Sequence, residues 1–133
     1  MQKSFQSEEA VVEVIASKAG TITCSKGKAV RVNRAAPNAA SVFYDAVIVP
    51  GGKSAGSLAK SGAAINFINE TFHHGKPIAA LSDGKSVLEA ARLPEMTKKV
   101  GVFTADDESV LPAFIDAIKQ HRYHNRTVAP VAA

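Results

Sequence analysis

The chain has 133 residues, of which 46% are hydrophobic and 21% charged, and its net charge is +4. These values indicate one globular domain, large enough to bury a core, without low-complexity segments. Its apolar runs are far shorter than the roughly 20 residues of a membrane span, and its first residues lack the apolar centre of a signal peptide. We therefore expect a cytoplasmic protein that contacts no membrane.

Cysteine and histidine are scarce in this chain. The single cysteine, Cys24, excludes an internal disulfide framework and a CxxC metal site, and it fits a reducing compartment. It falls in a predicted hairpin strand, where a small, partly buried side chain is expected. The chain has four histidines and no tryptophan, so we expect no haem or zinc site built from this chain alone.

The first half of the chain predicts strands. Residues 1–9 resemble the end of a helix, and residues 11–16 are β-branched enough to form a strand. Residues 21–24 and 29–32 flank Gly27, which favours a hairpin turn. Residues 46–49 form a continuous apolar run before Pro50, which is typical of a parallel strand covered on both faces.

The second half alternates helices and strands. The helical spacing of four apolar residues predicts one long helix that ends at Gly75. They are Leu58, Ile65, Ile68 and Phe72. A strand at 78–81, a short helix at 86–92 and a strand at 101–104 follow. The last helix carries an apolar stripe, and it has three candidate caps. The stripe consists of Val110, Leu111, Phe114, Ala117 and Ile118, and the candidate caps are Asp106, Asp107 and Ser109. This alternation predicts an α/β fold over residues 1–127, with a loose tail at 128–133.

The turn after strand 78–81 carries the clearest candidate site. Ser82, Asp83 and Gly84 stand where a strand runs through a tight turn into a helix, the geometry that exposes a nucleophile in many α/β enzymes. A serine needs a neighbouring base, and no histidine occurs between Gly75 and Gln120. The alternative is structural, with Ser82 and Asp83 capping the following helix.

Two further groups of residues allow a functional and a structural interpretation. Gly51 and Gly52 either form an oxyanion loop or only satisfy the φ values of a strand-to-helix turn. His73 and His74 fit a partly exposed helix end better than a metal site. Near the carboxyl end, a basic cluster is expected to be a solvated helix end and not a nucleic-acid site. Its members are Lys119, His121, Arg122, His124 and Arg126.

Several motifs together carry a family resemblance. Residues 44–52 (YDAVIVPGG) followed by 76–84 (KPIAALSDG) resemble the DJ-1/PfpI, class I glutamine amidotransferase-like superfamily. Within this superfamily, the chain is similar to the carboxyl-terminal domain of large-subunit catalases. This narrower similarity rests on residues 72–79 (FHHGKPIA), 105–107 (ADD) and 121–126 (HRYHNR). The resemblance implies a flavodoxin-like parallel sheet with helices on both faces, plus a small β-hairpin.

The resemblance also bears on chemistry. Active members of the superfamily place a cysteine where this chain has Ser82, and often a histidine where it has Asp83. The resemblance therefore implies a non-catalytic stability and assembly domain, with haem and peroxide chemistry in a preceding catalase core. A free-standing hydrolase or glyoxalase-like enzyme using Ser82 is the alternative. A holdase-type chaperone that binds unfolded clients is a third possibility.

One element of the superfamily is not found in this sequence. A first strand ordinarily precedes the helix that we expect to end at Glu9, and it lies in the middle of the sheet between the strands at 11–16 and 46–49. Each buried backbone group left without a partner costs about 1–3 kcal/mol. We therefore expect a sheet without the usual first strand, and self-association that covers the open edges.

Overall fold

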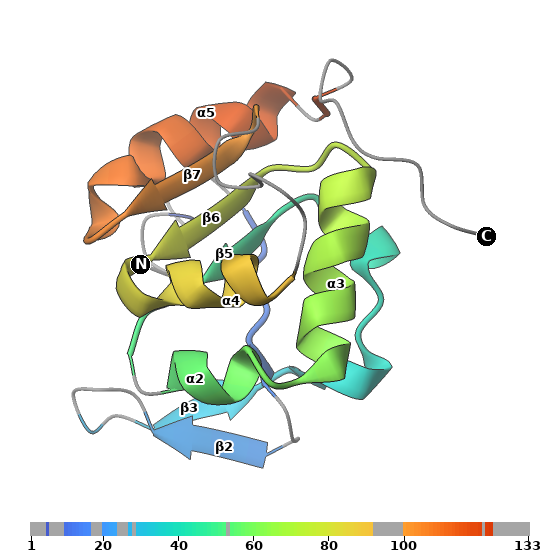
Figure 1. The fold of residues 1–133 in the computed structure, drawn as a ribbon, viewed down its shortest axis with the longest axis vertical. Helices are drawn as coiled ribbons and strands as arrows, with labels where there is room; N and C mark the ends of the chain where they lie inside the picture. Colours follow the sequence, from blue (N-terminus) through green and yellow to red (C-terminus); the bar gives the residue numbers. More distant parts are fainter. Residues whose placement is uncertain are drawn as a thin grey trace.

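In the computed structural model, helices cover both faces of a short parallel sheet (Figure 1). The structure describes residues 5, 10–16, 20–23, 27, 29–52, 54–91, 100–120 and 122–123. The central sheet has the order β5-β6-β7, formed by β5 (Val47–Val49), β6 (Ile78–Leu81) and β7 (Val102–Ala105). Both pairings are parallel, with Val47 opposite Ile78 and Ile78 opposite Val102. The predicted α/β fold is confirmed.

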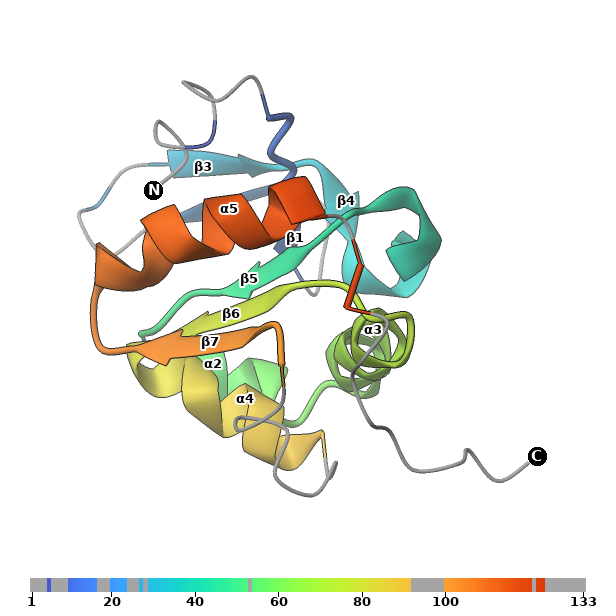
Figure 2. The ribbon, with the colours of Figure 1, turned by 90° about the horizontal axis from the view of Figure 1, so that it is seen from above.

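The middle strand explains why the fold has two helical layers. All four residues of β6 are buried, and alternate side chains point to opposite faces of the sheet. Ile78 and Ala80 share a core with α2 (Ser54–Leu58), α3 (Gly62–His73) and α4 (Lys85–Ala90). Ala79 faces α5 (Leu111–Gln120), which covers the other side (Figure 2). The continuous apolar run at residues 78–81 is therefore a strand enclosed on both faces.

The long helix predicted around Leu58 and Phe72 is two helices. The Ser61 hydroxyl accepts a hydrogen bond from the Ala64 N–H at 3.3 Å, which begins α3 as a new helix. Glycines at 56 and 62 weaken a continuous helix through this region. The predicted end is correct, because His74 caps α3 and Gly75 follows with a φ of +70°.

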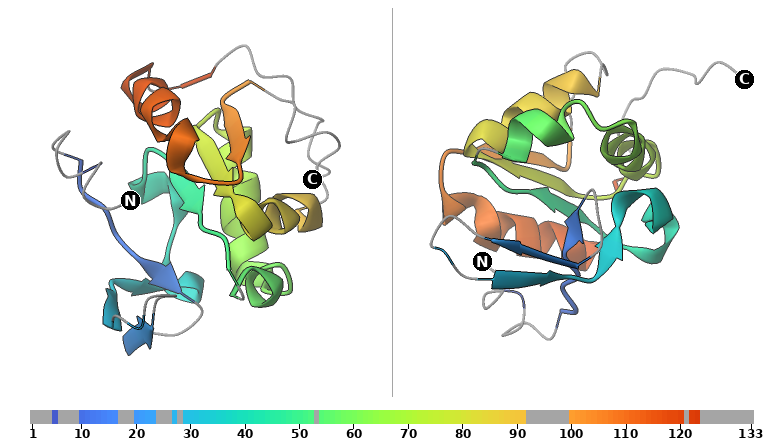
Figure 3. Two further views of the ribbon diagram at one scale, coloured as in Figure 1. Left: turned by 90° about the vertical axis from the view of Figure 1, so that its left-hand side faces the viewer. Right: turned by 90° about the horizontal axis from the view of Figure 1, so that it is seen from below.

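The strand expected at residues 11–16 is shorter than predicted. Only β1 (Ile15–Ala16) forms a ladder, parallel to β4 (Arg34–Ala35). The Val14 N–H donates instead to the Asn33 side chain at 2.7 Å, so a side-chain oxygen replaces a ladder acceptor there. The predicted hairpin is present as β2 (Gly20–Thr23) and β3 (Ala29–Val32), set apart from the central sheet (Figure 3). Two short 3-10 helices, η1 (Ala36–Asn38) and η2 (Ser41–Phe43), then lead to β5.

One edge of the central sheet has no partner strand among the described residues. Within the described residues β5 pairs only with β6, and β1 belongs to a separate two-stranded sheet. The Val47 N–H donates to the Pro77 carbonyl at 3.2 Å, so Val47 faces β6. Neighbouring residues of a strand direct their backbone groups to opposite edges, so the N–H and C=O of Ile48 point away from β6. This edge of β5 is therefore a possible place for another strand to pair.

Asp107, one of the three predicted caps, begins the last helical segment. The Asp107 carboxylate accepts the Ser109 N–H at 2.9 Å and starts η5 (Glu108–Val110), which continues into α5. Several sequence predictions lie outside the described residues. Of the helix expected at residues 1–9, only Phe5 is described, and it is helical. The other predictions outside the described residues concern Cys24, Arg92, His121, His124, Arg126 and the tail at 128–133.

Candidate functional site

The turn between β6 and α4 is tight, as the sequence predicts, and its backbone is strained at Ser82. Ser82 has a φ of +49° and is the only non-glycine residue with a positive φ in the described part of the chain. This conformation costs a side-chain-bearing residue about 1–3 kcal/mol. Leu81 before it is buried, whereas Ser82 and Asp83 are exposed. The fold thus raises the Ser82 side chain out of the sheet at a strained position.

The glycine loop after β5 lies directly against this turn. A Cβ built on Gly51 would lie 2.7 Å from the Ser82 Cβ, and a Cβ on Gly84 would lie 2.5 Å from the Val49 carbonyl oxygen. Neither separation is possible between real atoms, so the two segments approach this closely only because glycine stands at both positions. Gly52 follows Gly51 on the exposed side. The structure therefore brings Gly51, Gly52, Ser82, Asp83 and Gly84 together at the carboxyl ends of β5 and β6.

The capping role expected for Ser82 and Asp83 is wrong. The 3-10 turn η3 (Ser82–Gly84) has Leu81 as its N-cap, α4 has Gly84, and neither start has a side-chain cap hydrogen bond. Among the described residues, the side-chain hydrogen bond to this turn runs the other way, because the Ser86 hydroxyl donates to the Asp83 carbonyl at 2.7 Å. The positive φ of Ser82 explains the difference, since an N-cap residue ordinarily has an extended backbone.

Replacing Asp83 with alanine should therefore leave stability nearly unchanged. Exposed side chains that make no specific contact usually alter the free energy of unfolding by less than about 0.5 kcal/mol. Urea titration of the variant beside the wild type measures this. A loss of more than about 1 kcal/mol would restore Asp83 as a cap.

The described histidines lie at the other end of β6 from Ser82. His73 ends α3 with its Nδ1 2.7 Å from the Asn69 carbonyl oxygen, and His74 is exposed beside it. The four residues of β6 separate them from Ser82, a rise of roughly 13 Å. A general base must come within about 3 Å of its proton. Neither histidine meets that requirement.

A charged pair lies next to the strained turn. The Lys85 Nζ donates to the Asp106 Oδ1 at 2.8 Å, which links the start of α4 to the end of β7. The Asp106 side chain is 92% exposed, so water screens this pair and it contributes at most about 1 kcal/mol. Lys85 is thus held by a carboxylate across the sheet edge.

Tyr44, Glu13 and Arg34 form a hydrogen-bonded group that was not predicted from the sequence. The Tyr44 hydroxyl donates to the Glu13 Oε2, and the Arg34 Nε donates to the same oxygen at 3.3 Å. The Tyr44 ring packs against Phe67, with the ring centres 5.7 Å apart. Burial, and then the hydrogen bond to Glu13, raise the pKa of Tyr44 to about 12. The hydrogen bond between Tyr44 and Glu13 joins the segment before β1 to the loop before β5. No short sequence motif predicts it.

This raised pKa gives a prediction for alkaline unfolding. The stabilisation by the neutral Tyr44 hydroxyl is fully present below pH 10, the ordinary pKa of tyrosine, and is lost as pH rises from 10 through about 12. Tyr44→Phe should therefore remove part of the fall in stability across this range while leaving the other titrating groups unchanged. Denaturant titrations of both proteins at several alkaline pH values measure the difference. Parallel curves would mean that Tyr44 does not titrate with unfolding.

The described residues contain neither a metal-binding cluster nor a membrane-spanning helix. No group of three or more histidine, cysteine, aspartate or glutamate side chains there could hold a metal ion. In the same part of the chain, no helix has the length and apolar character to cross a bilayer.

Comparison with known proteins places this geometry in a family. The model of the C-terminal domain found in long catalases matches residues 1–128. Catalase HPII of Mycobacterium avium is 37% identical over 139 residues, which cover 93% of this chain and 20% of that protein. Catalase-2 of Bacillus subtilis is 30% identical over 130 residues, covering 95% of this chain and 18% of that protein. The chain thus spans about a fifth of the length of these relatives.

A solved structure supports the fold independently. The ThiJ/PfpI domain protein of Brachyspira murdochii superposes with a TM-score of 0.75 at 15% identity, covering 90% of this chain and 86% of that one. At this level of identity the likeness concerns the fold alone. It confirms the DJ-1/PfpI-like architecture that the motifs at residues 44–52 and 76–84 predict.

Proposed function

The chain belongs to the family of C-terminal domains found in long catalases, and we propose that it serves there as a non-catalytic domain for stability and assembly. The chemistry of peroxide decomposition would belong to the preceding part of such a protein. The chain itself would contribute a folded unit that slows unfolding of the whole and joins subunits.

The arrangement at the strained turn is the observation that carries this proposal. The fold holds Ser82 in a raised position, yet the described histidines lie at the far end of β6. A serine hydroxyl without a base is a weak nucleophile, and a positioned base ordinarily contributes about 10²–10⁴-fold in rate. A domain that retains the shape of the site, with neither described histidine near the hydroxyl, is better suited to a structural role.

Neither the two described histidines nor Tyr44 fits a haem. Haem iron needs an axial ligand such as histidine, cysteine or tyrosine directed into an apolar cavity. His73 is within hydrogen-bonding distance of the Asn69 carbonyl, His74 is exposed, and the Tyr44 hydroxyl is engaged by Glu13. In the proposal, haem is therefore held by the preceding catalase core.

The test compares a long catalase with and without this segment. An in-frame catalase coding region upstream of the codon for Met1 would identify the polypeptide. Removing the segment should shorten the half-life of catalase activity at elevated temperature and reduce the number of subunits in the oligomer, while turnover per haem stays the same. Equal half-lives and equal subunit numbers would contradict a role in stability and assembly, and a loss of turnover per haem would contradict a non-catalytic one.

The strained turn also keeps a second candidate function open, that of a hydrolase or glyoxalase-like enzyme using Ser82. The positive φ of Ser82 supports it, because such strain is often kept at functional sites. We nevertheless expect the purified chain to convert activated esters and methylglyoxal no faster than buffer, since neither described histidine lies beside the hydroxyl. Ser82→Ala is the matched control. Turnover by the wild type that disappears in this variant would establish the enzyme and overturn our proposal.

The holdase hypothesis has less support. The large apolar side chains that are exposed in the described part of the chain are spread over distant positions, with two neighbours among them. They are Val11, Ile22, Val42, Phe43 and Val100. A surface that binds unfolded clients would gather such residues into one patch.

A further inference from the structure

A basic hollow lies at the end of β6 opposite the strained turn. Its volume is 330 Å³, and Val42, His74, Lys76 and Arg122 line it. The three nitrogen-bearing side chains come from two segments, because His74 and Lys76 lie in the loop between α3 and β6 and Arg122 follows α5.

Lys76 is held rigidly at the hollow. The residue is only 3% exposed, and its Nζ donates to the Ser41 carbonyl oxygen at 2.6 Å. Ser41 is itself 1% exposed, and its hydroxyl donates to the Glu70 Oε2 at 3.1 Å, which anchors η2 against α3. A lysine fixed in this way has already lost most of its rotamer freedom, so a ligand would bind without ordering it.

Arg122 is brought to the hollow by a close backbone contact. The Tyr123 N–H donates to the Gly75 carbonyl at 2.7 Å, and a Cβ on Gly75 would lie 2.9 Å from the Tyr123 carbonyl oxygen. Gly75 also has a φ of +70°, so both its conformation and the space beside it favour glycine. Arg122 is half-buried as a result, which differs from the solvated helix end expected from the basic cluster.

Both cations and carboxylates surround the Lys76 ammonium. Burial lowers the pKa of Lys76, the nearby Arg122 guanidinium lowers it further, and Asp45 and Glu70 raise it. Burial has thus removed part of the water around the ammonium, with a second cation close by. Both cations would attract an anion in the hollow, most strongly where water is partly excluded.

We propose that this hollow binds a small ligand that carries a carboxylate or phosphate group, contacted by Lys76, Arg122 and His74, with an apolar part against Val42. Arginine suits such a group because its planar fork can donate two hydrogen bonds to one oxyanion. The site is separate from the turn at Ser82 and does not depend on the proposed catalase role.

The first test titrates the purified chain with citrate and, separately, with inorganic phosphate at constant ionic strength, followed by calorimetry and by backbone NMR shifts. Binding of either anion, with shifts confined to residues around the hollow, is expected. Citrate binding alone would assign a carboxylate ligand, and phosphate binding alone a phosphorylated one. If neither anion binds, the proposal fails.

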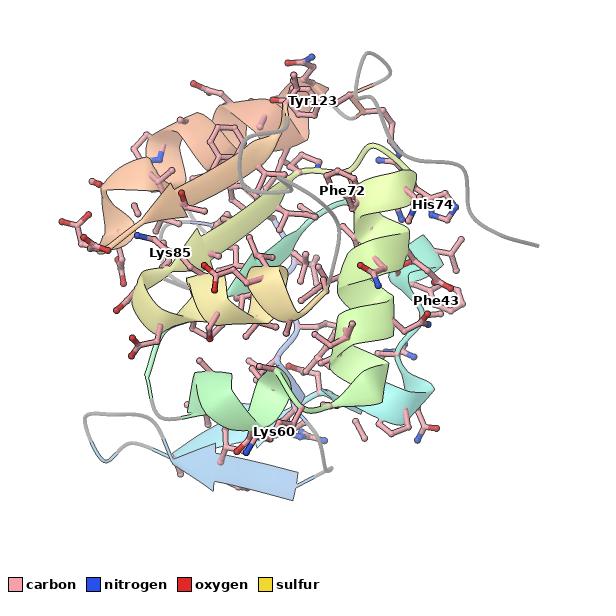
Figure 4. The ribbon with its side chains drawn as sticks, in the orientation of Figure 1. Phe43, Lys60, Phe72, His74, Lys85 and Tyr123 are labelled. Atoms are coloured by element: carbon pink, nitrogen blue, oxygen red, sulfur yellow. The ribbon has the colours of Figure 1, made fainter. Side chains whose placement is uncertain are left out.

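Charge-removing variants locate the site. Arg122→Gln and His74→Gln should each weaken binding, with about a tenfold loss for Arg122, equivalent to ~1.4 kcal/mol. Lys85→Gln is the matched control, because Lys85 is paired with Asp106 and lies on the other side of the molecule from His74 (Figure 4). Equal weakening in all three variants would show that the anions respond only to net charge, which would overturn the proposal.

A variant that supplies its own carboxylate gives a measurement that does not depend on the choice of anion. Val42 is 70% exposed on the rim, so Val42→Glu places a carboxylate at the hollow with little disturbance of packing. This variant should melt about 3 °C above Val42→Gln in anion-free buffer and should no longer bind citrate or phosphate. If Val42→Glu and Val42→Gln melt together and bind anions equally, the cations do not form a site.

Discussion

Replacing Phe114 with alanine is expected to lower the free energy of unfolding by about 3–5 kcal/mol. Phe114 lies in α5 and is only 1% exposed. Its ring packs edge-on against Phe5 and Phe103, with centre-to-centre distances of 6.1 Å and 6.0 Å. Truncation would remove both ring contacts and leave a cavity between α5 and the sheet. Because folded domains have only about 5–15 kcal/mol of stability in total, this loss would be a large fraction of it.

Phe43 provides a control with the same side chain on the surface. It is 72% exposed, and its ring is contacted by the Arg34 guanidinium carbon 5.9 Å from the ring centre. Phe43→Ala should cost no more than about 1 kcal/mol, the value of an exposed cation–π contact. Urea titrations of both variants and the wild type give the comparison. Similar losses in the two variants would mean that α5 does not form a tightly packed core with the sheet.

The second large effect concerns the mass of the particle in solution. We expect the chain to form at least a dimer, because the edge of β5 away from β6 has no partner strand among the described residues. The N–H and C=O of Ile48 point toward that edge, while its side chain packs in the core beside α5. A strand edge with its face already packed is a ready template for pairing with another chain. Exchange of an element between copies would cover both edges at low cost.

Light scattering at micromolar concentration measures this directly. The expected mass is at least twice the 13.9 kDa of one chain. Dilution should lower both the mass and the melting temperature, because association stabilises the folded state by mass action. A monomer with cooperative unfolding at all concentrations would contradict the prediction, since it would show that β5 is stable as an outer strand.

Local patterns were reliable where a single neighbour decides the structure. Residues 78–81 are apolar without interruption, and they form a strand buried on both faces. Gly75 ends α3, and Asp107 starts the last helical segment, because each acts on backbone groups a few residues away. The same local reasoning failed at residues 11–16, since β-branched side chains favour extended backbone but do not supply a partner strand.

The candidate site was predicted in position but not in detail. The motif at residues 76–84 located the turn after β6, and the glycines after β5 lie against it as the family resemblance implies. The role of Ser82 and Asp83 as caps was wrong, because the close fit of Gly51 and Gly84 fixes the turn in a conformation that no capping residue adopts. Such a constraint comes from atoms distant in the sequence.

The α/β layering, the position of the turn after β6 and the family can be read from the sequence, because periodicity and short motifs encode these within a few residues. The contact of Tyr44 with Glu13, the proximity of Arg122 to Lys76 and the backbone strain at Ser82 emerge only from the folded structure. Tyr44 and Glu13 are 31 positions apart in the sequence, and Arg122 and Lys76 are 46 positions apart. Burial and charge at such contacts depend on how whole elements pack, and no local pattern of residues specifies that.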